Sequence, residues 1–167
     1  FPKYGIDGFY MQELFKFEPE LHKMMSESIE MGRAFIISDY QQKPMPLFLL
    51  WKGIVHTTLR HPEHKYLIGG VSISDQFSDF SKSLMIEFMK SHYYDSTVAQ
   101  YVRPKKEYKV KLSEEDKQFI FDETEADLNK FDKLIDELEP NMLRLPVFIK
   151  KYVKQNAKVI AFNVDPN

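Results

Sequence analysis

The stretch of chain that most constrains the fold runs from residue 29 to residue 74. Its first part, residues 29–38, is rich in β-branched and aromatic residues and predicts a strand. A polar loop ending in Lys43 and Pro44 follows, then an apolar helix after Pro46, then an uncharged strand over residues 66–74. In several folds this order aims helix N-terminal amides at an anionic ligand. It therefore indicates a site for an anionic ligand.

The helix and the second strand of this stretch carry different burial patterns. Apolar side chains recur at helical spacing from Leu47 through Trp51 to Val55 and predict a buried face. The strand over residues 66–74 has almost no polar interruption, so we expect it to be covered on both faces of a sheet. Gly69 and Gly70 permit close approach of a ligand or a neighbouring element, and packing is the commoner reason.

The rest of the chain alternates between helical and strand-like segments. We expect a helix capped by Ser78, a helical stretch opened by a capping box of Ser113 and Asp116 and broken near residues 122–124, a helix over residues 146–155, and a strand over residues 158–164. A chain of 167 residues is long enough for one sizeable core. We therefore predict a mixed α/β (α+β) fold in a single domain spanning residues 1–167.

Composition limits the compartment and the partners. The chain has no cysteine, which excludes a disulfide framework and thiolate metal sites and fits a reducing, cytoplasmic compartment. Lys52 interrupts the most apolar run, so we expect no membrane-spanning helix. The chain starts at Phe1 without a charged and then apolar leader, and we interpret that start as a trimmed end.

Charge is distributed in blocks. Residues 113–139 carry eleven acidic and three basic side chains, which we interpret as a solvated helical surface. Basic residues flank this block, and they could meet an anionic partner. The candidates are Lys105, Lys106, Lys150, Lys151 and Lys154. A sequence pI of about 6.2 disfavours nucleic acid as that partner.

Glu30 and Arg33 are the candidate catalytic pair. In a regular strand two residues three apart point to opposite faces, so a bulge at Gly32 would be needed to bring them together. Such a bulge frees backbone N–H groups for an oxyanion, and acyl transfer from a thioester to an amine needs those donors and a base. Glu30 could be that base. An ion pair or a solvent contact at the strand end is the alternative.

Other chemistries find less support in the chain. Lys43 and the amides beside it could hold a phosphate, but the glycines of a phosphate cradle are absent, and a polar connector is the alternative. His61 and His64 sit in a turn around Pro62 with no third ligand nearby, so we expect no metal site. The chain has no Gly-x-Ser-x-Gly elbow and no His-x-x-x-x-Asp pair.

Four segments together resemble a known family. They are Glu-Met-Gly-Arg-Ala-Phe-Ile at residues 30–36, Leu-Phe-Leu-Leu-Trp-Lys-Gly-Ile at residues 47–54, Tyr-Leu-Ile-Gly-Gly-Val-Ser at residues 66–72 and Leu-Pro-Val-Phe-Ile-Lys-Lys-Tyr at residues 145–152. The chain from about Glu27 onward is similar to the ornithine-lipid and glycine-lipid N-acyltransferases, which are often labelled hemolysins and belong to the acetyltransferase-like superfamily.

The resemblance implies a mixed sheet flanked by helices and the transfer of a (3-hydroxy)fatty acyl group to the amine of an amino acid. The donor would be the acyl-phosphopantetheine of acyl carrier protein, or acyl-CoA, with no bound cofactor and no metal. Glu30 and Arg33 would be catalytic. Residues 30–38 would be the strand that splays to admit the donor, opposite residues 66–74. The implied donor contacts are Gly32, Phe35, Ile36, Lys43, Trp51 and Ser72.

The chain departs from the superfamily in two places. Residues 40–44 replace the glycine-rich pyrophosphate loop, which suits a carrier-protein donor docking on the basic residues. We also expect the earliest strands of the fold to be absent, so that the N-terminus is incomplete. The product is a lipid, which predicts a peripheral location at the inner membrane and contact with its surface. The alternative function is a non-catalytic lipid- or protein-binding module, in keeping with the hemolysin label.

Overall fold

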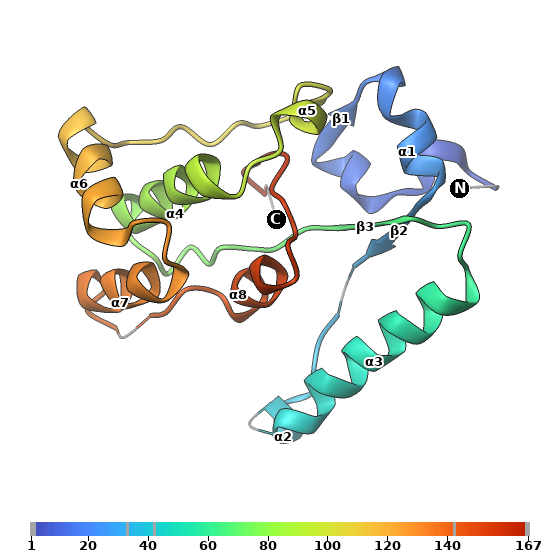
Figure 1. Ribbon diagram of the computed structural model, residues 1–167, viewed down its shortest axis with the longest axis horizontal. Helices are drawn as coiled ribbons and strands as arrows, with labels where there is room; N and C mark the ends of the chain where they lie inside the picture. The colour runs from blue at the N-terminus through green and yellow to red at the C-terminus, as the bar shows by residue number, and fades with distance from the viewer. Residues whose placement is uncertain (1–2, 33, 42, 142, 166–167) are drawn as a thin grey trace. The chain divides into compact units, whose positions relative to one another are not determined.

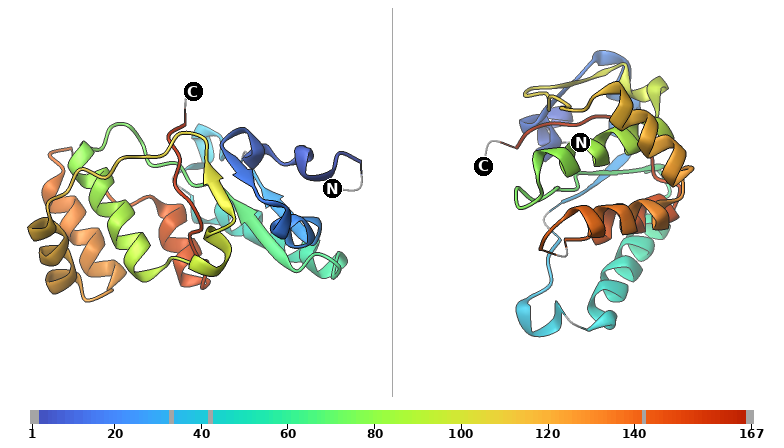
Figure 2. Two further views of the ribbon diagram at one scale, coloured as in Figure 1. Left: turned by 90° about the horizontal axis from the view of Figure 1, so that it is seen from above. Right: turned by 90° about the vertical axis from the view of Figure 1, so that its left-hand side faces the viewer.

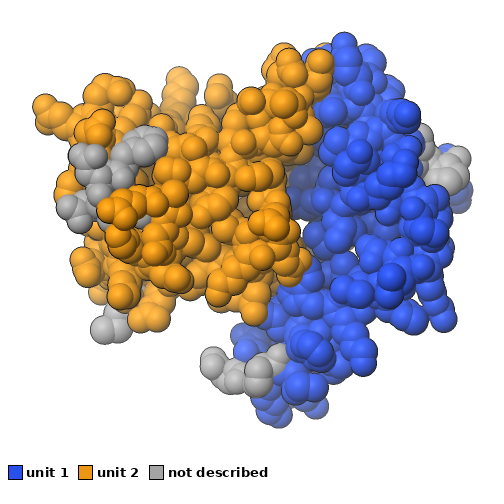
Figure 3. Space-filling model, in the orientation of Figure 1, with its two compact units in different colours: residues 1–13, 17–70 blue, residues 14–16, 71–167 orange. Residues whose placement is uncertain are grey.

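The computed structural model describes residues 3–32, 34–41, 43–141 and 143–165. The chain forms a mixed α/β structure in which helices predominate and the sheets are small (Figure 1). This confirms the predicted fold class. The chain divides into two compact units, residues 1–13 with 17–70 and residues 14–16 with 71–167 (Figure 3). A single domain over the whole chain stays a prediction.

The first unit contains short 3₁₀ helices, two paired strands and one long helix. Its elements are η1 (Gly5–Gly8), η2 (Tyr10–Glu13), η3 (Pro19–Leu21), α1 (His22–Ser26), β2 (Ser28–Met31), α2 (Ser38–Gln41), α3 (Pro44–Arg60) and β3 (Tyr66–Gly69). Phe9, Leu21 and Met25 are its buried apolar side chains together with Phe17. The strands β2 and β3 run parallel, and the crossover between them contains α2 and α3.

The second unit is mainly helical. Its elements are α4 (Asp79–His92), α5 (Ser96–Ala99), β4 (Val102–Pro104), α6 (Glu114–Thr124), α7 (Leu128–Leu138) and α8 (Val147–Lys154), with β4 paired to β1 (Phe15–Phe17). Figure 2 shows α4, α6 and α7 side by side. The rings of Phe88 on α4 and Phe131 on α7 stack with centroids 4.0 Å apart, at the centre of one apolar cluster.

The helix boundaries of the second unit follow local sequence signals. The Ser78 hydroxyl accepts from the Ser81 N–H and caps α4. Ser113 and Asp116 form the predicted capping box at the start of α6, with reciprocal bonds of 3.0 and 3.1 Å. The helical stretch breaks at Glu125 and Ala126, both with positive φ, just after the predicted position. The helix predicted over residues 146–155 is α8.

A buried carboxylate joins α7 to α4. Glu139, at the end of α7, is only 5% exposed, and its Oε1 accepts from the Ser78 N–H at 3.1 Å and the Ser78 hydroxyl at 2.7 Å. Burial alone would raise the pKa of Glu139, but the neighbouring Ser81 hydroxyl and the two Ser78 donors outweigh it, so the pKa lies below its ordinary value. The negative charge sits at the N-terminus of α4, where the helix dipole favours it.

Three strand predictions are wrong in extent. The strand expected over residues 29–38 ends at Met31, the strand expected over residues 66–74 ends at Gly69, and residues 158–164 form one bridge at Val159 instead of a strand. The second strand is also mostly exposed rather than covered on both faces. β-branched and aromatic residues favour a strand only where a partner strand supplies hydrogen bonds, and the described ladder ends at Met31 and Gly69.

Candidate active site

The strand pair β2 and β3 is the centre of the candidate site. Its register pairs Ser28 with Tyr66 through Met31 with Gly69, and the ladder ends there. A Cβ atom on Gly69 would lie 2.6 Å from the Met31 carbonyl oxygen, closer than carbon and oxygen tolerate. Gly69 therefore serves backbone packing, the commoner of the two readings of the glycine pair.

Glu30 lies on β2, and both of its carboxylate oxygens accept hydrogen bonds from backbone N–H groups of the same chain. Its Oε2 accepts from the Tyr10 N–H at 2.7 Å and its Oε1 accepts from the Met11 N–H at 2.8 Å. These N–H groups open η2, where the first donors of a helix have no partner within the helix. Each carboxylate oxygen keeps a second lone pair, so a proton can still be accepted. The role of Glu30 as base stays a prediction.

The segment after β2 differs from the predicted continuous strand. Gly32 follows the end of β2, so it is not a bulge within a strand, and Arg33 lies outside the described residues. Phe35 is 78% exposed, and Ile36 is half-buried with its carbonyl accepting from the Gln41 side chain at 2.9 Å. No backbone hydrogen bond joins Gly32 or Phe35 to another described residue. Their N–H groups remain available for a ligand.

The start of α3 is poor in amide donors. The helix begins at Pro44, two residues before the predicted start, and Pro44 and Pro46 both lack an N–H. Among the first three helix residues only Met45 can donate. Lys43 precedes the helix in an extended conformation, and its ammonium lies 4.6 Å from the centre of the Tyr40 ring. An anion at this terminus would depend mainly on the Lys43 charge.

The two remaining predicted donor contacts, Trp51 and Ser72, belong to different units of the chain. Trp51 is half-buried on α3 in the first unit, whereas Ser72 is exposed and belongs to the second unit. Within the first unit the structure brings Glu30 together with η2 and the Gly69 end of β3. The roles of Trp51 and Ser72 stay predictions.

The predicted carrier-binding lysines all lie in the second unit. Lys105, Lys106, Lys151 and Lys154 are exposed, and none forms an ion pair with a described residue. Lys150 differs, because its ammonium lies 2.9 Å from the Asp132 carboxylate and is partly buried. Four of the five cations are therefore available to an anionic partner.

The histidines show no metal centre. His61 Nδ1 lies 3.0 Å from the Glu63 carboxylate, and the His64 ring packs near that of His61. Across the residues that the structure describes, no group of three potential ligands among His, Cys, Asp and Glu could hold a metal ion. The exposed Glu63 carboxylate has a lowered pKa because of its backbone hydrogen bond and of His61.

Sequence reasoning missed two features of the molecule. The bonds from Glu30 to η2 join residues 19 and 20 positions apart, and no local pattern signals them. A cavity in the second unit is lined by Lys90, Arg103 and Glu107, which lie on separate elements. In the sequence, only the neighbouring basic residues Lys105 and Lys106 indicate a site in this region.

Comparison with known proteins supports an acyl-transfer function for the segment that contains Glu30 and β2. Residues 2–51, which include η2, Glu30 and β2, match the model of the acetyltransferase (GNAT) domain. The chain is also distantly similar to the glycine N(alpha)-acyltransferase of Bacteroides thetaiotaomicron, with 24% identity over 107 residues. That alignment covers 60% of this chain and 31% of the relative. No solved structure matches the chain significantly.

No helix in the described ranges is long and apolar enough to cross a membrane. The cytoplasmic location and the contact with a membrane surface stay predictions.

Proposed function

We propose that the chain is part of an N-acyltransferase that moves a fatty acyl group from an acyl thioester to the amine of an amino acid in aminolipid synthesis. One observation carries the proposal: the parallel ladder of β2 and β3 ends at Met31 and Gly69, and β2 lies in the segment that matches the GNAT domain. The backbone N–H groups of Gly32 and Phe35 are then free to pair with an extended donor. The similarity to a glycine acyltransferase favours an amino acid as acceptor.

The chemistry needs few groups. The neutral amine attacks the thioester carbonyl, and the oxygen of the tetrahedral intermediate takes up negative charge. Backbone N–H groups such as those of Gly32 and Phe35 can stabilise that oxygen. A base removes the extra proton of the nitrogen. The carbon–sulfur bond then breaks, and the departing thiolate takes up that proton and leaves as the thiol. Glu30 is the proposed base, directly or through a water molecule. Arg33 is proposed as the second catalytic residue.

The test is acyl transfer to glycine from an acyl carrier protein or acyl-CoA, followed by mass spectrometry. We expect Glu30→Gln to lower kcat by roughly 100-fold. The matched control is Glu27→Gln, because Glu27 precedes the same strand and forms an ion pair with Lys65 at 3.0 Å. It should retain turnover.

Glu30 also accepts hydrogen bonds from η2, so the loss of a base must be distinguished from a change in structure when kcat falls. The glycine ammonium gives both proteins an acidic limb in the pH profile of kcat/KM, and a base adds to the wild-type limb a second ionisation that the Gln variant should lack. A lower rate with an unchanged profile would make Glu30 a positioning residue only. Absence of turnover with every thioester would favour the alternative, a non-catalytic lipid- or protein-binding module.

The proposed donor is acyl carrier protein, which is acidic. Its docking would use Lys105, Lys106, Lys151 and Lys154, with Lys150 contributing less because it is paired with Asp132. Reversing the four exposed charges should raise KM for the carrier-bound donor at least several-fold and leave kcat similar. The same variant should keep its KM for acyl-CoA. If KM for the carrier does not move, these cations serve another anionic partner, and binding to anionic vesicles tests the membrane surface.

A further inference from the structure

The second unit contains a cavity that the proposed chemistry has not used. Its volume is about 450 Å³, within the range of small-molecule sites. Buried Ala99 and Val102 line it together with the rings of Tyr94, Tyr108 and Phe162. All of these residues belong to the second unit, so the cavity is complete within it.

One wall of the cavity is formed by residues 160–162, whose backbone lacks hydrogen-bond partners among the described residues. The segment is fixed at one end, where the Val159 N–H donates to Tyr93 at 2.7 Å, and at the other, where the Val164 N–H donates to Lys106 at 2.7 Å. Between these ends, no hydrogen bond joins the backbone of residues 160–162 to any other described residue, although all three are half-buried. Half-buried peptide groups without a protein partner can bond to water or to a ligand.

Charges of both signs surround the same cavity. Lys90 and Arg103 line it with Glu107, and none of the three forms an ion pair with a described residue. The Lys90 ammonium lies 5.7 Å from the centre of the Phe162 ring, which lies beside the open backbone segment. A ligand that carries an anion and a cation a few bonds apart would satisfy both kinds of charge, whereas a simple anion would leave Glu107 unmatched.

We propose that this cavity takes up the free α-amino acid as its zwitterion, before the amine is deprotonated for transfer; this inference rests on the proposed function. Arg103 and Lys90 hold the carboxylate, and Glu107 and the carbonyl groups of residues 160–162 hold the ammonium. The N–H groups of the same segment add donors for the carboxylate. The cavity is much larger than glycine and has aromatic walls, so it also accepts amino acids with an apolar side chain.

The test is direct binding of amino acids to the full chain, measured by calorimetry without any acyl donor. Glycine and phenylalanine should both bind, and acetate or methylamine, which each carry one charge, should bind at least tenfold more weakly. Arg103→Met and Glu107→Gln should each weaken binding about tenfold. The matched controls are Lys109→Met and Glu115→Gln, which remove exposed charges outside the cavity and should leave the Kd unchanged.

The outcomes separate this inference from the proposed function. Acyl transfer to amino acids with an acceptor KM that neither Arg103→Met nor Glu107→Gln changes would overturn the cavity assignment and leave the function standing. Equal binding of acetate and glycine would also overturn it, as would binding of pantetheine in place of amino acids. Charge-dependent amino-acid binding in a protein that acylates no amine would support the cavity and remove the function.

Discussion

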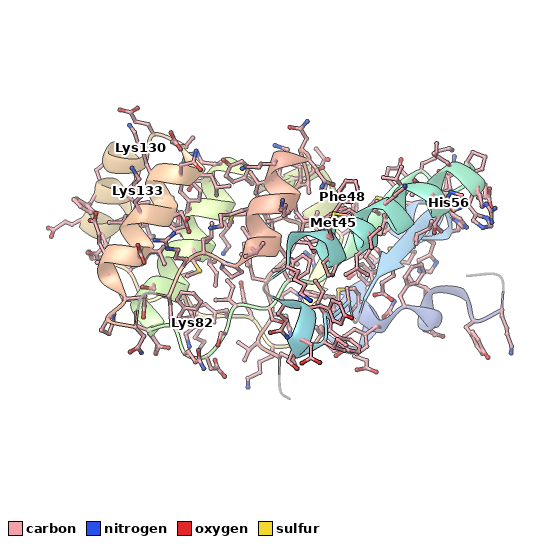
Figure 4. The ribbon with its side chains drawn as sticks, turned by 90° about the horizontal axis from the view of Figure 1, so that it is seen from below. Met45, Phe48, His56, Lys82, Lys130 and Lys133 are labelled. Carbon is pink, nitrogen blue, oxygen red and sulfur yellow. The ribbon has the colours of Figure 1, made fainter. Side chains whose placement is uncertain are left out.

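The second unit buries its apolar side chains in one cluster, whereas the long helix of the first unit leaves many of its own exposed. Phe88, Phe131 and Ile135 are at most 1% exposed. On α3, by contrast, Met45, Phe48 and Leu49 are each more than half exposed (Figure 4). The comparison teaches that stability is concentrated in the second unit, while the first unit keeps an apolar surface that its own residues do not cover.

The helices α7 and α3 illustrate the contrast in detail. On α7, Phe131 and Ile135 form a buried face, and Lys130 and Lys133 are exposed on the other side (Figure 4). On α3, Leu49, Val55 and Leu59 line a shallow depression together with Lys52 and His56. Apolar residues therefore occupy the exposed face of α3 as well as its half-buried face.

The largest expected effect on the free energy of unfolding comes from a substitution in the core of the second unit. Phe131→Ala removes a fully buried ring from its stack on Phe88 and should lower the free energy of unfolding by about 3–5 kcal/mol. Phe48→Ala, on the exposed face of α3, should change it by less than about 1 kcal/mol. Urea denaturation of both variants checks this. Similar losses would mean that Phe48 is packed in solution and that the contrast between the units is wrong.

A smaller effect concerns the carboxylate that joins α7 to α4. Glu139→Gln weakens two hydrogen bonds at a buried site and should cost about 1–3 kcal/mol at neutral pH. Because folding lowers the pKa of Glu139 below its ordinary 4.5, the wild-type carboxylate stabilises the protein fully above pH 4.5 and loses this contribution as the pH falls through the folded-state pKa.

The measurement is the free energy of unfolding against pH for both proteins. The two curves should converge as the pH falls below 4.5, because protonation removes the wild-type advantage. Parallel curves across this range would show that Glu139 does not contribute through its charge.

The smallest effect sharpens the comparison inside the first unit. Gly69→Ala places a methyl group against the Met31 carbonyl oxygen and should cost roughly 1–3 kcal/mol. Gly53→Ala is the matched control, because a Cβ on this residue of α3 meets nothing within 4 Å, and it should stabilise the protein by about 0.5–1 kcal/mol. Thermal unfolding reports both. Equal effects would show that β2 and β3 do not approach closely at Met31.

Sequence predicted the parts of the molecule that depend on neighbouring residues. Ser78, Ser113 with Asp116, and the apolar spacing around Phe131 define helices through contacts three or four positions away. The strand predictions are wrong where pairing decides the structure: residues 34–37 and 160–162 have strand-like composition, but no described strand pairs with them. Sequence selects Glu30 from its place beside Gly32 and Arg33, and its catalytic role stays a prediction; its two bonds to η2 join residues 19 and 20 positions apart, which no local pattern signals.

The bond between Glu139 and Ser78 has a consequence for the order of folding. The two residues are 61 positions apart, so α4 receives this partner only after the intervening chain has closed into a loop. Helix formation is local and fast, whereas this closure is slow and carries an entropic cost. A nascent chain that ends before residue 139 therefore holds α4 with its N-terminus incompletely satisfied. Emergence of the end of α7 therefore supplies the carboxylate that completes the N-terminus of α4.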